Sequence, residues 1–127
     1  EMYKTSKGEY VAPAQIEMGF AENSNVEQIC VVGQNLPQPL ALVVLSDIGR
    51  KVSREELVEN FKEQLNTLNP TLKSYEKVKK IVVLKELWTV ENNKMTPTMK
   101  IKRNVIEKEF EPSYEKWYED SEVIIFE

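Results

Sequence analysis

The sequence predicts an α+β domain in which a small central sheet of about three strands is flanked by helices, with a β-hairpin at the N-terminus. Three short runs rich in β-branched residues are nearly continuous in apolar side chains, as in strands covered on both faces: 29–32, 40–45 and 81–84. Between the second and third runs, apolar residues recur at helical spacing. The chain has 127 residues, the length of one domain.

The N-terminal segment is predicted to form the hairpin and then a helix. Tyr3 and Tyr10 flank the turn Thr5–Gly8, and Gly8 can take the positive φ that such turns often need. Pro13 suits the first turn of a helix, because the N–H that proline lacks would have no helical partner there.

The middle of the chain is predicted to contain two paired strands and one long helix. Gly33 and the turn at 37–39 join the first two strands, which indicates antiparallel pairing. Ser53 and Glu56 form a capping-box pattern at the helix start, and the Asn-Pro pair at 69–70 ends the helix. One apolar face is expected to pack on the sheet rather than form a groove; it consists of Leu57, Val58, Phe61, Leu65 and Leu68.

The C-terminal third is predicted to hold shorter elements. Residues 74–78 suggest one helical turn ahead of the third strand, and residues 104–110 and 113–119 suggest two short helices. The apolar tail 123–126 could add an edge strand or dock against another domain.

A basic end sits on an acidic body. Residues 73–103 hold nine Lys and Arg residues and three Glu, a local formal charge of +6, whereas the whole chain has a net charge of −4. Opposite potentials concentrate ligands, so an anion is the expected partner of this end. A turn at Asn92-Asn93 places Lys100 on a loop outside the packed core.

Missing residue types exclude several kinds of chemistry. The sequence has no histidine, which removes Ser-His-Asp and Cys-His nucleophiles and histidine metal sites. Cys30 is the single cysteine, so neither an internal disulfide nor a cysteine zinc site can form. The four glycines form no phosphate-binding pattern. We therefore expect a buried Cys30, a reducing compartment, no metal site, and a chain that is not a complete enzyme.

Residues Thr96–Arg103 resemble the last motif of the AMP-forming acyl-CoA synthetase superfamily, a threonine and short loop before Lys-Ile-x-Arg. In that family the lysine neutralises charge where the substrate carboxylate attacks the α-phosphate of ATP, so the resemblance implies Lys100 as the catalytic residue. Lys102 and Arg103 then either bind phosphate, or solvate the loop and cap the next helix. Most members have glycine before the lysine, where this chain has Met99; the Thr-Pro-Thr form is closer to the long-chain fatty acyl branch.

Residues Lys4–Glu17 resemble the superfamily motif that follows the interdomain hinge, Lys-x-Ser-x-Gly-x-x-Val-x-Pro-x-x-Ile-Glu. In the family this hairpin swings in to line the pantetheine tunnel during thioester formation. The hinge residue itself would lie just upstream of Glu1, so we expect the chain to be a piece cut at a domain boundary. The coenzyme A side of the reaction is implied for Lys4, Ser6, Lys7, Gly8 and Glu9.

Together the two motifs, about ninety positions apart as in the family, identify residues 1–127 as similar to a C-terminal lid domain. The resemblance implies a long-chain fatty acid CoA ligase that uses ATP, Mg²⁺ and coenzyme A, with a large N-terminal adenylation domain as the lid's partner. Acyl-adenylate forms first; the lid then rotates and coenzyme A displaces AMP. The isolated domain is expected to bind these compounds weakly and to be inactive.

Several alternatives stay open. The lid could belong to another carboxylate-activating relative, such as an aryl or short-chain CoA ligase or a luciferase-like enzyme, or the chain could be a stand-alone α+β interaction module with a basic end. Taken singly, the Lys100 segment also fits a solvated basic loop, and the first motif fits a plain hairpin with a proline-started helix.

A nucleic-acid surface would use the lysines near the third strand, with aromatic residues as stacking platforms. These residues are Lys77, Lys79, Lys80, Tyr75 and Trp88. We expect no nucleic-acid partner, because the net charge is acidic and no strand has the aromatic and basic pattern of an RNA-binding sheet.

The longest apolar run, residues 40–45, is far shorter than the ~18 residues that a membrane span needs. The first residues, Glu1–Lys4, have no apolar core behind a basic tip and so do not resemble a signal peptide. We expect a cytoplasmic protein, and leave open that the full-length enzyme associates peripherally with a membrane.

Overall fold

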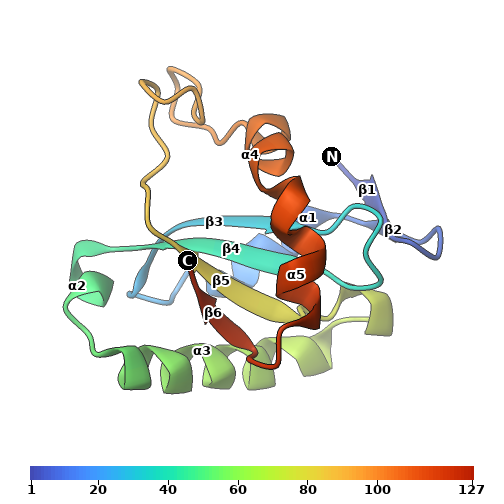
Figure 1. Ribbon diagram of the computed structural model, residues 1–127, viewed down its shortest axis with the longest axis horizontal. Helices are drawn as coiled ribbons and strands as arrows, with labels where there is room; N and C mark the ends of the chain where they lie inside the picture. The colour runs from blue at the N-terminus through green and yellow to red at the C-terminus, as the bar shows by residue number, and fades with distance from the viewer.

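The computed structural model describes residues 1–127 and contains a mixed sheet with strand order β3-β4-β5-β6 (Figure 1). β3 and β4 are antiparallel, whereas β4, β5 and β6 run parallel to one another. The predicted α+β fold, its three central strands and the antiparallel first pair are confirmed, and the tail adds a fourth strand at the edge. The strands are β3 (Val26–Val32), β4 (Leu40–Leu45), β5 (Lys80–Leu84) and β6 (Ile124–Phe126).

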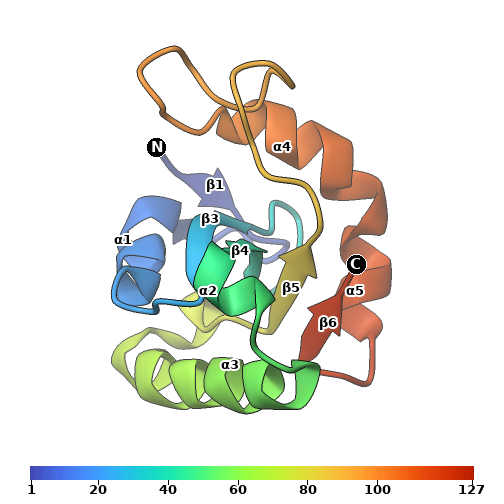
Figure 2. The same ribbon diagram turned by 90° about the vertical axis from the view of Figure 1, so that its left-hand side faces the viewer.

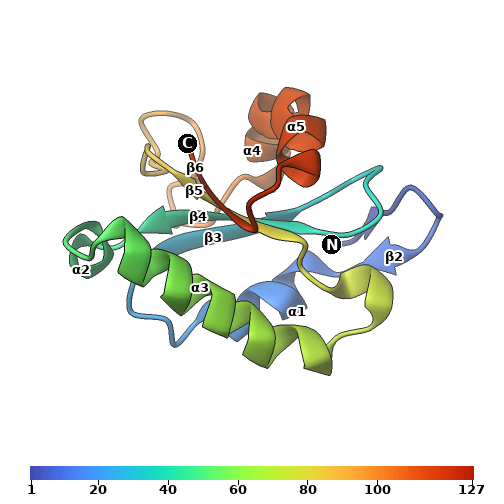
Figure 3. The same ribbon diagram turned by 60° about the horizontal axis from the view of Figure 1, so that its bottom comes forward.

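Helices cover both faces of this sheet (Figures 2 and 3). α1 (Pro13–Glu17) and α3 (Arg54–Leu68) lie on one face, and α4 (Arg103–Phe110) and α5 (Tyr114–Glu119) lie on the other. Short helical pieces complete the chain: α2 (Asp47–Arg50) and 3₁₀ turns at Met18–Phe20, Asn69–Thr71, Ser74–Glu76 and Glu111–Ser113. None of the helices combines the length and apolar character needed to cross a bilayer.

The sheet separates two apolar cores. Alternating side chains of β4 point to opposite faces, so Ala41 and Val43 pack with α1 and α3, whereas Leu40, Leu42 and Val44 pack with α4 and α5. Full burial of both faces explains why the strand sequences are continuous rather than alternating.

Local signals set the bounds of the long helix as predicted. The Ser53 hydroxyl accepts a hydrogen bond from the Glu56 backbone N–H at 3.2 Å, and α3 ends at Leu68, two residues before Pro70. Its buried residues are Leu57, Phe61 and Leu65, which pack on the sheet as expected.

The predicted N-terminal hairpin is also confirmed. β1 (Tyr3–Lys4) pairs with β2 (Tyr10–Val11), and Gly8 in the turn has a φ of 85°. The hairpin is attached to the β3–β4 connection, because Ser6 N donates to Leu36 O at 3.0 Å. The hairpin is therefore anchored to this connection by its backbone.

Cys30 is completely buried in β3, on the α4 side of the sheet. Burial raises the pKa of its thiol to about 12, so the reactive thiolate is suppressed at neutral pH. The prediction of a buried apolar cysteine is confirmed.

Candidate functional site

The segment that carries Lys100 is a small hairpin, residues 94–102, here called the lysine loop. At its base, Lys102 N donates to Lys94 O at 2.8 Å; nearer the tip, Thr96 N donates to Lys100 O at 2.7 Å. These bonds fold the segment back on itself and place the basic residue close to the turn, on the exposed loop that the sequence predicted.

Apolar side chains attach this loop to the domain. Met95 and Ile101 face each other across the hairpin in an isolated antiparallel bridge. Met95 is buried in the core beneath α4 and α5, and Ile101 packs against the same core. These two residues thus anchor the lysine loop to that core.

The Lys100 side chain is exposed, and its ammonium forms no hydrogen bond and no ion pair within the domain. Its backbone N–H donates to the Thr96 hydroxyl at 3.1 Å, which fixes the main chain while leaving the ammonium free. A compact ammonium on a flexible stem, carried by a fixed main chain, is suited to placing one positive charge in a site outside the domain.

Met99 stands where most family members have glycine, and its backbone shows why glycine suits the position. Its φ is 68°, in the left-handed region, and its N–H closes the turn onto Thr96 O at 2.8 Å. A side chain in this conformation costs about 1–2 kcal/mol, which glycine avoids. This chain therefore keeps the turn at the expense of local backbone strain.

Arg103, directly after the loop, is bound within the domain. Its guanidinium contacts the two carboxylate oxygens of Glu17 at 2.5 and 3.0 Å, Glu1 at 3.1 Å, and the Val31 carbonyl at 3.0 Å. The side chain is 13% exposed. Arg103 therefore neither solvates the loop nor caps α4 with its side chain, but ties the start of α4 to α1 and β3; the phosphate contact stays a prediction.

Lys102 has a similar local contact, since its ammonium donates to the Asn93 side-chain oxygen at 2.6 Å. Asn93 occupies the predicted turn and has a φ of 66°. Lys102 therefore braces the turn that leads into the lysine loop.

The hairpin residues implied in coenzyme A chemistry gather at the other candidate region. Ser6, Lys7 and Gly8 are exposed at the tip. Lys4 is exposed on β1, and its ammonium lies 5.6 Å from the centre of the Tyr10 ring.

Thr5 organises this hairpin, a role that the sequence did not reveal. Its hydroxyl donates to the Glu9 carboxylate at 3.0 Å and accepts from the backbone N–H groups of Lys7 and Glu9 at 3.3 and 3.2 Å. A threonine inside a turn was the available signal, because Ser and Thr hydroxyls commonly bond nearby backbone groups.

The structure does not bring the two regions together. The lysine loop and the tip of the N-terminal hairpin lie far apart along the long axis of the molecule (Figures 1 and 3). Lys100, on that loop, is thus separated from the hairpin tip with Ser6, Lys7, Gly8 and Glu9, whereas Lys4 at the base of the hairpin lines one hollow together with Arg103.

Glu17 and Arg103 form a link between these regions that was not predicted from the sequence. Glu17 ends the first motif and Arg103 ends the second, and 86 positions separate them along the chain. Glu17 also accepts a hydrogen bond from Val31 N at 2.7 Å, so α1, β3 and α4 meet at this pair. The available signal was that the last residues of the two motifs, Glu17 and Arg103, carry opposite charges.

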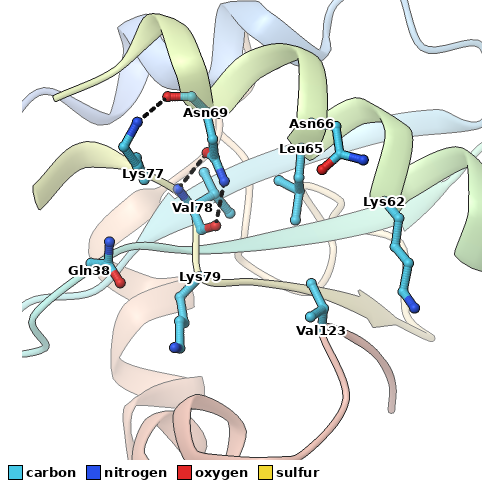
Figure 4. Close-up of a pocket in the computed structure, with 9 residues that line it drawn as sticks. All are labelled: Gln38, Lys62, Leu65, Asn66, Asn69, Lys77, Val78, Lys79 and Val123. Atoms are coloured by element: carbon cyan, nitrogen blue, oxygen red, sulfur yellow. Dashed lines mark hydrogen bonds between the residues drawn. The ribbon is translucent and has the colours of Figure 1, made fainter. Parts of the chain in front are cut away.

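A cavity of about 410 Å³ between α3 and the start of β5 is lined by Lys62, Lys77 and Lys79 (Figure 4). The three ammonium groups point in different directions. Lys77 donates to the Asn69 carbonyl at 2.8 Å, and Lys79 lies 5.6 Å from the centre of the Tyr118 ring. The lysines therefore do not converge on one anion.

The residues of the nucleic-acid interpretation are also engaged in the fold. Trp88 is 1% exposed and offers no face for base stacking. Lys80 is buried, and its ammonium donates to the carbonyls of Asp120 and Glu122. Trp88 and Lys80 are therefore not available to such a surface, whereas Tyr75, Lys77 and Lys79 stay at least partly exposed.

Comparison with known proteins settles the family. The family described as AMP-binding enzyme C-terminal domain matches residues 2–122. The chain belongs to this family. The match includes both motifs, and the fold described above is that of an AMP-binding enzyme C-terminal domain.

Curated relatives of this domain include CoA ligases. Long-chain-fatty-acid–CoA ligase 5 of Mus musculus is 36% identical over 95% of this chain and 20% of its own length. Long-chain-fatty-acid–CoA ligase 1 of Homo sapiens is 31% identical over 92% of this chain and 19% of its own length. The chain therefore spans about one fifth of the length of these relatives.

Solved structures with this fold come from adenylating proteins. The adenylation domain of a carboxylate reductase from Mycobacterium chelonae has a TM-score of 0.78 and 26% identity, over 94% of this chain and 19% of that one. The fatty acyl CoA synthetase of Mycobacterium tuberculosis has a TM-score of 0.58 and 25% identity, over 88% of this chain and 20% of that one.

Proposed function

We propose that residues 1–127 are the C-terminal lid domain of an AMP-forming long-chain fatty acid CoA ligase, and that they act with a large N-terminal adenylation domain of the same protein. The names of the curated relatives, and the one fifth of their length that the chain spans, support this proposal. The observation that carries it is Lys100, an unpaired cation on a firmly held loop at the family's lysine position.

In the first half-reaction, a fatty acid carboxylate oxygen attacks the α-phosphate of ATP and pyrophosphate leaves. Negative charge develops on the phosphate oxygens as the new bond forms. Lys100 supplies a positive charge at that point, and because the loop is braced beforehand, little reorganisation is needed when the charge develops.

In the second half-reaction, the lid rotates, withdraws Lys100 and presents the N-terminal hairpin. The thiol of coenzyme A then attacks the acyl carbonyl, and AMP leaves. Lys4 and the tip residues Ser6, Lys7 and Gly8 line the approach of coenzyme A, with Glu9 held by Thr5 behind them. Two orientations of one lid answer a physical conflict, because one rigid site cannot complement two different transition states equally well.

Magnesium accompanies ATP in this family's chemistry. No group of three or more Cys, Asp or Glu side chains gathers in this domain in a way that could hold a metal ion. We therefore assign no Mg²⁺ ligand to these residues, and the domain's contribution is the charge of Lys100 and the two presented hairpins.

The test is Lys100→Ala in the full-length enzyme. We expect adenylation, measured by pyrophosphate release, to fall by ~10²–10³, the scale of losing one key partner of a developing oxyanion. Thioester formation from supplied acyl-adenylate is expected to be unaffected. Lys108→Ala is the matched control, because Lys108 is an exposed lysine of α4 without an ion pair. Equal losses in both half-reactions would refute the role of Lys100.

The substrate class needs a separate measurement. The full-length enzyme is expected to prefer long-chain fatty acids when kcat/KM is compared across acids of increasing chain length and one aryl acid. A preference for the aryl acid or for short acids would instead support the alternative of another carboxylate-activating ligase, with the same use of Lys100.

A further inference from the structure

Lys94, at the first position of the lysine loop, is a buried cation held by two carboxylates. Its ammonium lies 2.8 Å from Glu86 Oε1 and 2.8 Å from Glu109 Oε1, and its side chain is only 7% exposed. Glu86 follows β5 and Glu109 belongs to α4, so this one side chain joins three segments that are separate in the sequence.

The surroundings keep Lys94 charged. Burial alone lowers the pKa of its ammonium, but the hydrogen bonds with Glu109 and Glu86 outweigh that effect and raise the pKa overall. The hydrogen bond from Lys94 likewise lowers the pKa of Glu86. Lys94 and Glu86 are therefore both charged at neutral pH.

The backbone of Lys94 also fixes both ends of the lysine loop. Its N–H donates to Thr89 O at 3.0 Å, and its carbonyl accepts from Lys102 N at 2.8 Å. A shift of Lys94 would move the entry and the exit of the loop together, and with them the position from which Lys100 extends.

We propose that Lys94 is a positioning residue for adenylation: the Glu86–Lys94–Glu109 bridge holds the base of the lysine loop against α4 and the end of β5, and so sets where Lys100 is presented. The inference rests on the proposed function. Lys94 does not act on the substrate itself, because its ammonium is enclosed and already bound by two carboxylates.

The exposure of the two carboxylates indicates that loss of the Lys94 charge would affect the position of the loop more than the stability of the fold. The Glu86 and Glu109 side chains are 67% and 46% exposed, so both carboxylates can turn to water if Lys94 loses its charge. No unpaired charge is then left buried, which is the usual cause of a large stability loss. The main consequence falls on the placement of the loop.

The test is Lys94→Met in the full-length enzyme, which removes the charge and keeps the unbranched stem. We expect kcat for adenylation to fall about tenfold. Misplacement of a catalytic group by ~1 Å can cost 10²-fold, and the remaining contacts of the loop should keep the displacement of Lys100 smaller than that. Thioester formation from supplied acyl-adenylate is expected to stay within about twofold, a difference that a merely structural residue would not produce. Hydrogen exchange of the lysine loop is expected to become faster.

Lys85→Met is the matched control, because Lys85 is an exposed lysine beside Glu86 that makes no ion pair, and both half-reactions are expected to be unchanged. An unchanged adenylation rate in Lys94→Met, or equal losses in both half-reactions, would overturn the inference. If Lys94→Met does not fold, the single variant Glu86→Gln decides, because it weakens the bridge but leaves Glu109 as a carboxylate for Lys94; the same selective loss is expected and the same two outcomes count against it.

The two proposals fail separately. Normal adenylation in Lys100→Ala would remove the proposed function, and the inference with it. Loss of adenylation in Lys100→Ala together with normal adenylation in Lys94→Met would remove only the inference.

Discussion

The N-terminal hairpin, residues 3–11, and the lysine loop, residues 94–102, both project from the sheet but are held in different ways. Both are short antiparallel hairpins that expose lysines. The first is braced by the neutral hydroxyl of Thr5, and its Val11 packs in the core beneath α1 and α3. The second is braced by the ion pairs of Lys94 and belongs to the opposite core.

Under the proposed function, this difference would let one small domain serve two chemical steps. Each hairpin is attached to its own core, on its own face of the sheet. Their common element is the contact between Glu17 and Arg103, which ties the helix after the first hairpin to the helix after the second. Changes at this contact are expected to affect both regions, whereas changes in either hairpin are expected to stay local.

The largest effect is expected at the shared contact. Glu17→Gln keeps an oxygen for the Val31 N–H but leaves Arg103 largely buried with Glu1 as its remaining carboxylate. Breaking one side of a buried ion pair costs about 3 kcal/mol or more. Urea unfolding of the 127-residue domain measures this loss.

In the full-length enzyme, the same Glu17→Gln variant is expected to slow both half-reactions. Glu115→Gln, at an exposed glutamate of α5, is the matched control and is expected to change stability by less than about 0.5 kcal/mol. A selective loss of one half-reaction in Glu17→Gln would show that the contact does not join the two regions.

A smaller effect, confined to the N-terminal hairpin, is expected for Gly8→Ala. The φ of 85° is unfavourable for a side chain, and a Cβ placed there would meet nothing within 4 Å, so the cost is one of backbone conformation alone. We expect a stability loss of about 1 kcal/mol in urea unfolding. Gly8→Asn is expected to lose less, because asparagine tolerates this region; equal losses would point to a steric cause.

The smallest effect, of opposite sign, is expected in the lysine loop for Met99→Gly. Its φ of 68° is closer to the left-handed optimum than that of Gly8, so the strain to be relieved is smaller. Relief of strain is partly offset by the entropy that glycine loses on folding, which leaves a gain of about 0.5 kcal/mol in urea unfolding. Met99→Ala keeps the strain and is expected to give no gain; a gain equal to that of glycine would contradict this account.

Patterns within short segments were sufficient to predict most of the fold. Continuous apolar runs gave three strands, helical spacing after Ser53 gave α3, and Gly8 marked the first turn. The role of residues 123–126 stayed open, because a short apolar tail suits an edge strand and a docking segment equally well. The structure shows that this tail pairs with β5 and is an edge strand, and this long-range pairing is not recorded in the tail's own sequence.

The contacts that hold the candidate site could not be predicted in the same way. Lys94 and Arg103 appeared as members of a basic run, which usually indicates a solvated surface. Their partners are Glu86, Glu109 and Glu17, and the Glu17–Arg103 pair spans 86 positions. Long-range pairs of this kind depend on how the sheet brings helices together, which no local pattern records.

The two-faced packing of β4 has a consequence for how this sequence can change over generations. Successive residues of the strand pack in different cores. Leu42 packs in the core on the side of the lysine loop, and Val43 packs in the core on the side of the N-terminal hairpin. A substitution at one of them can be compensated by a neighbour on its own side without disturbing the other. Under the proposed function, β4 thus separates the core that supports the loop of the first half-reaction from the core that supports the hairpin of the second.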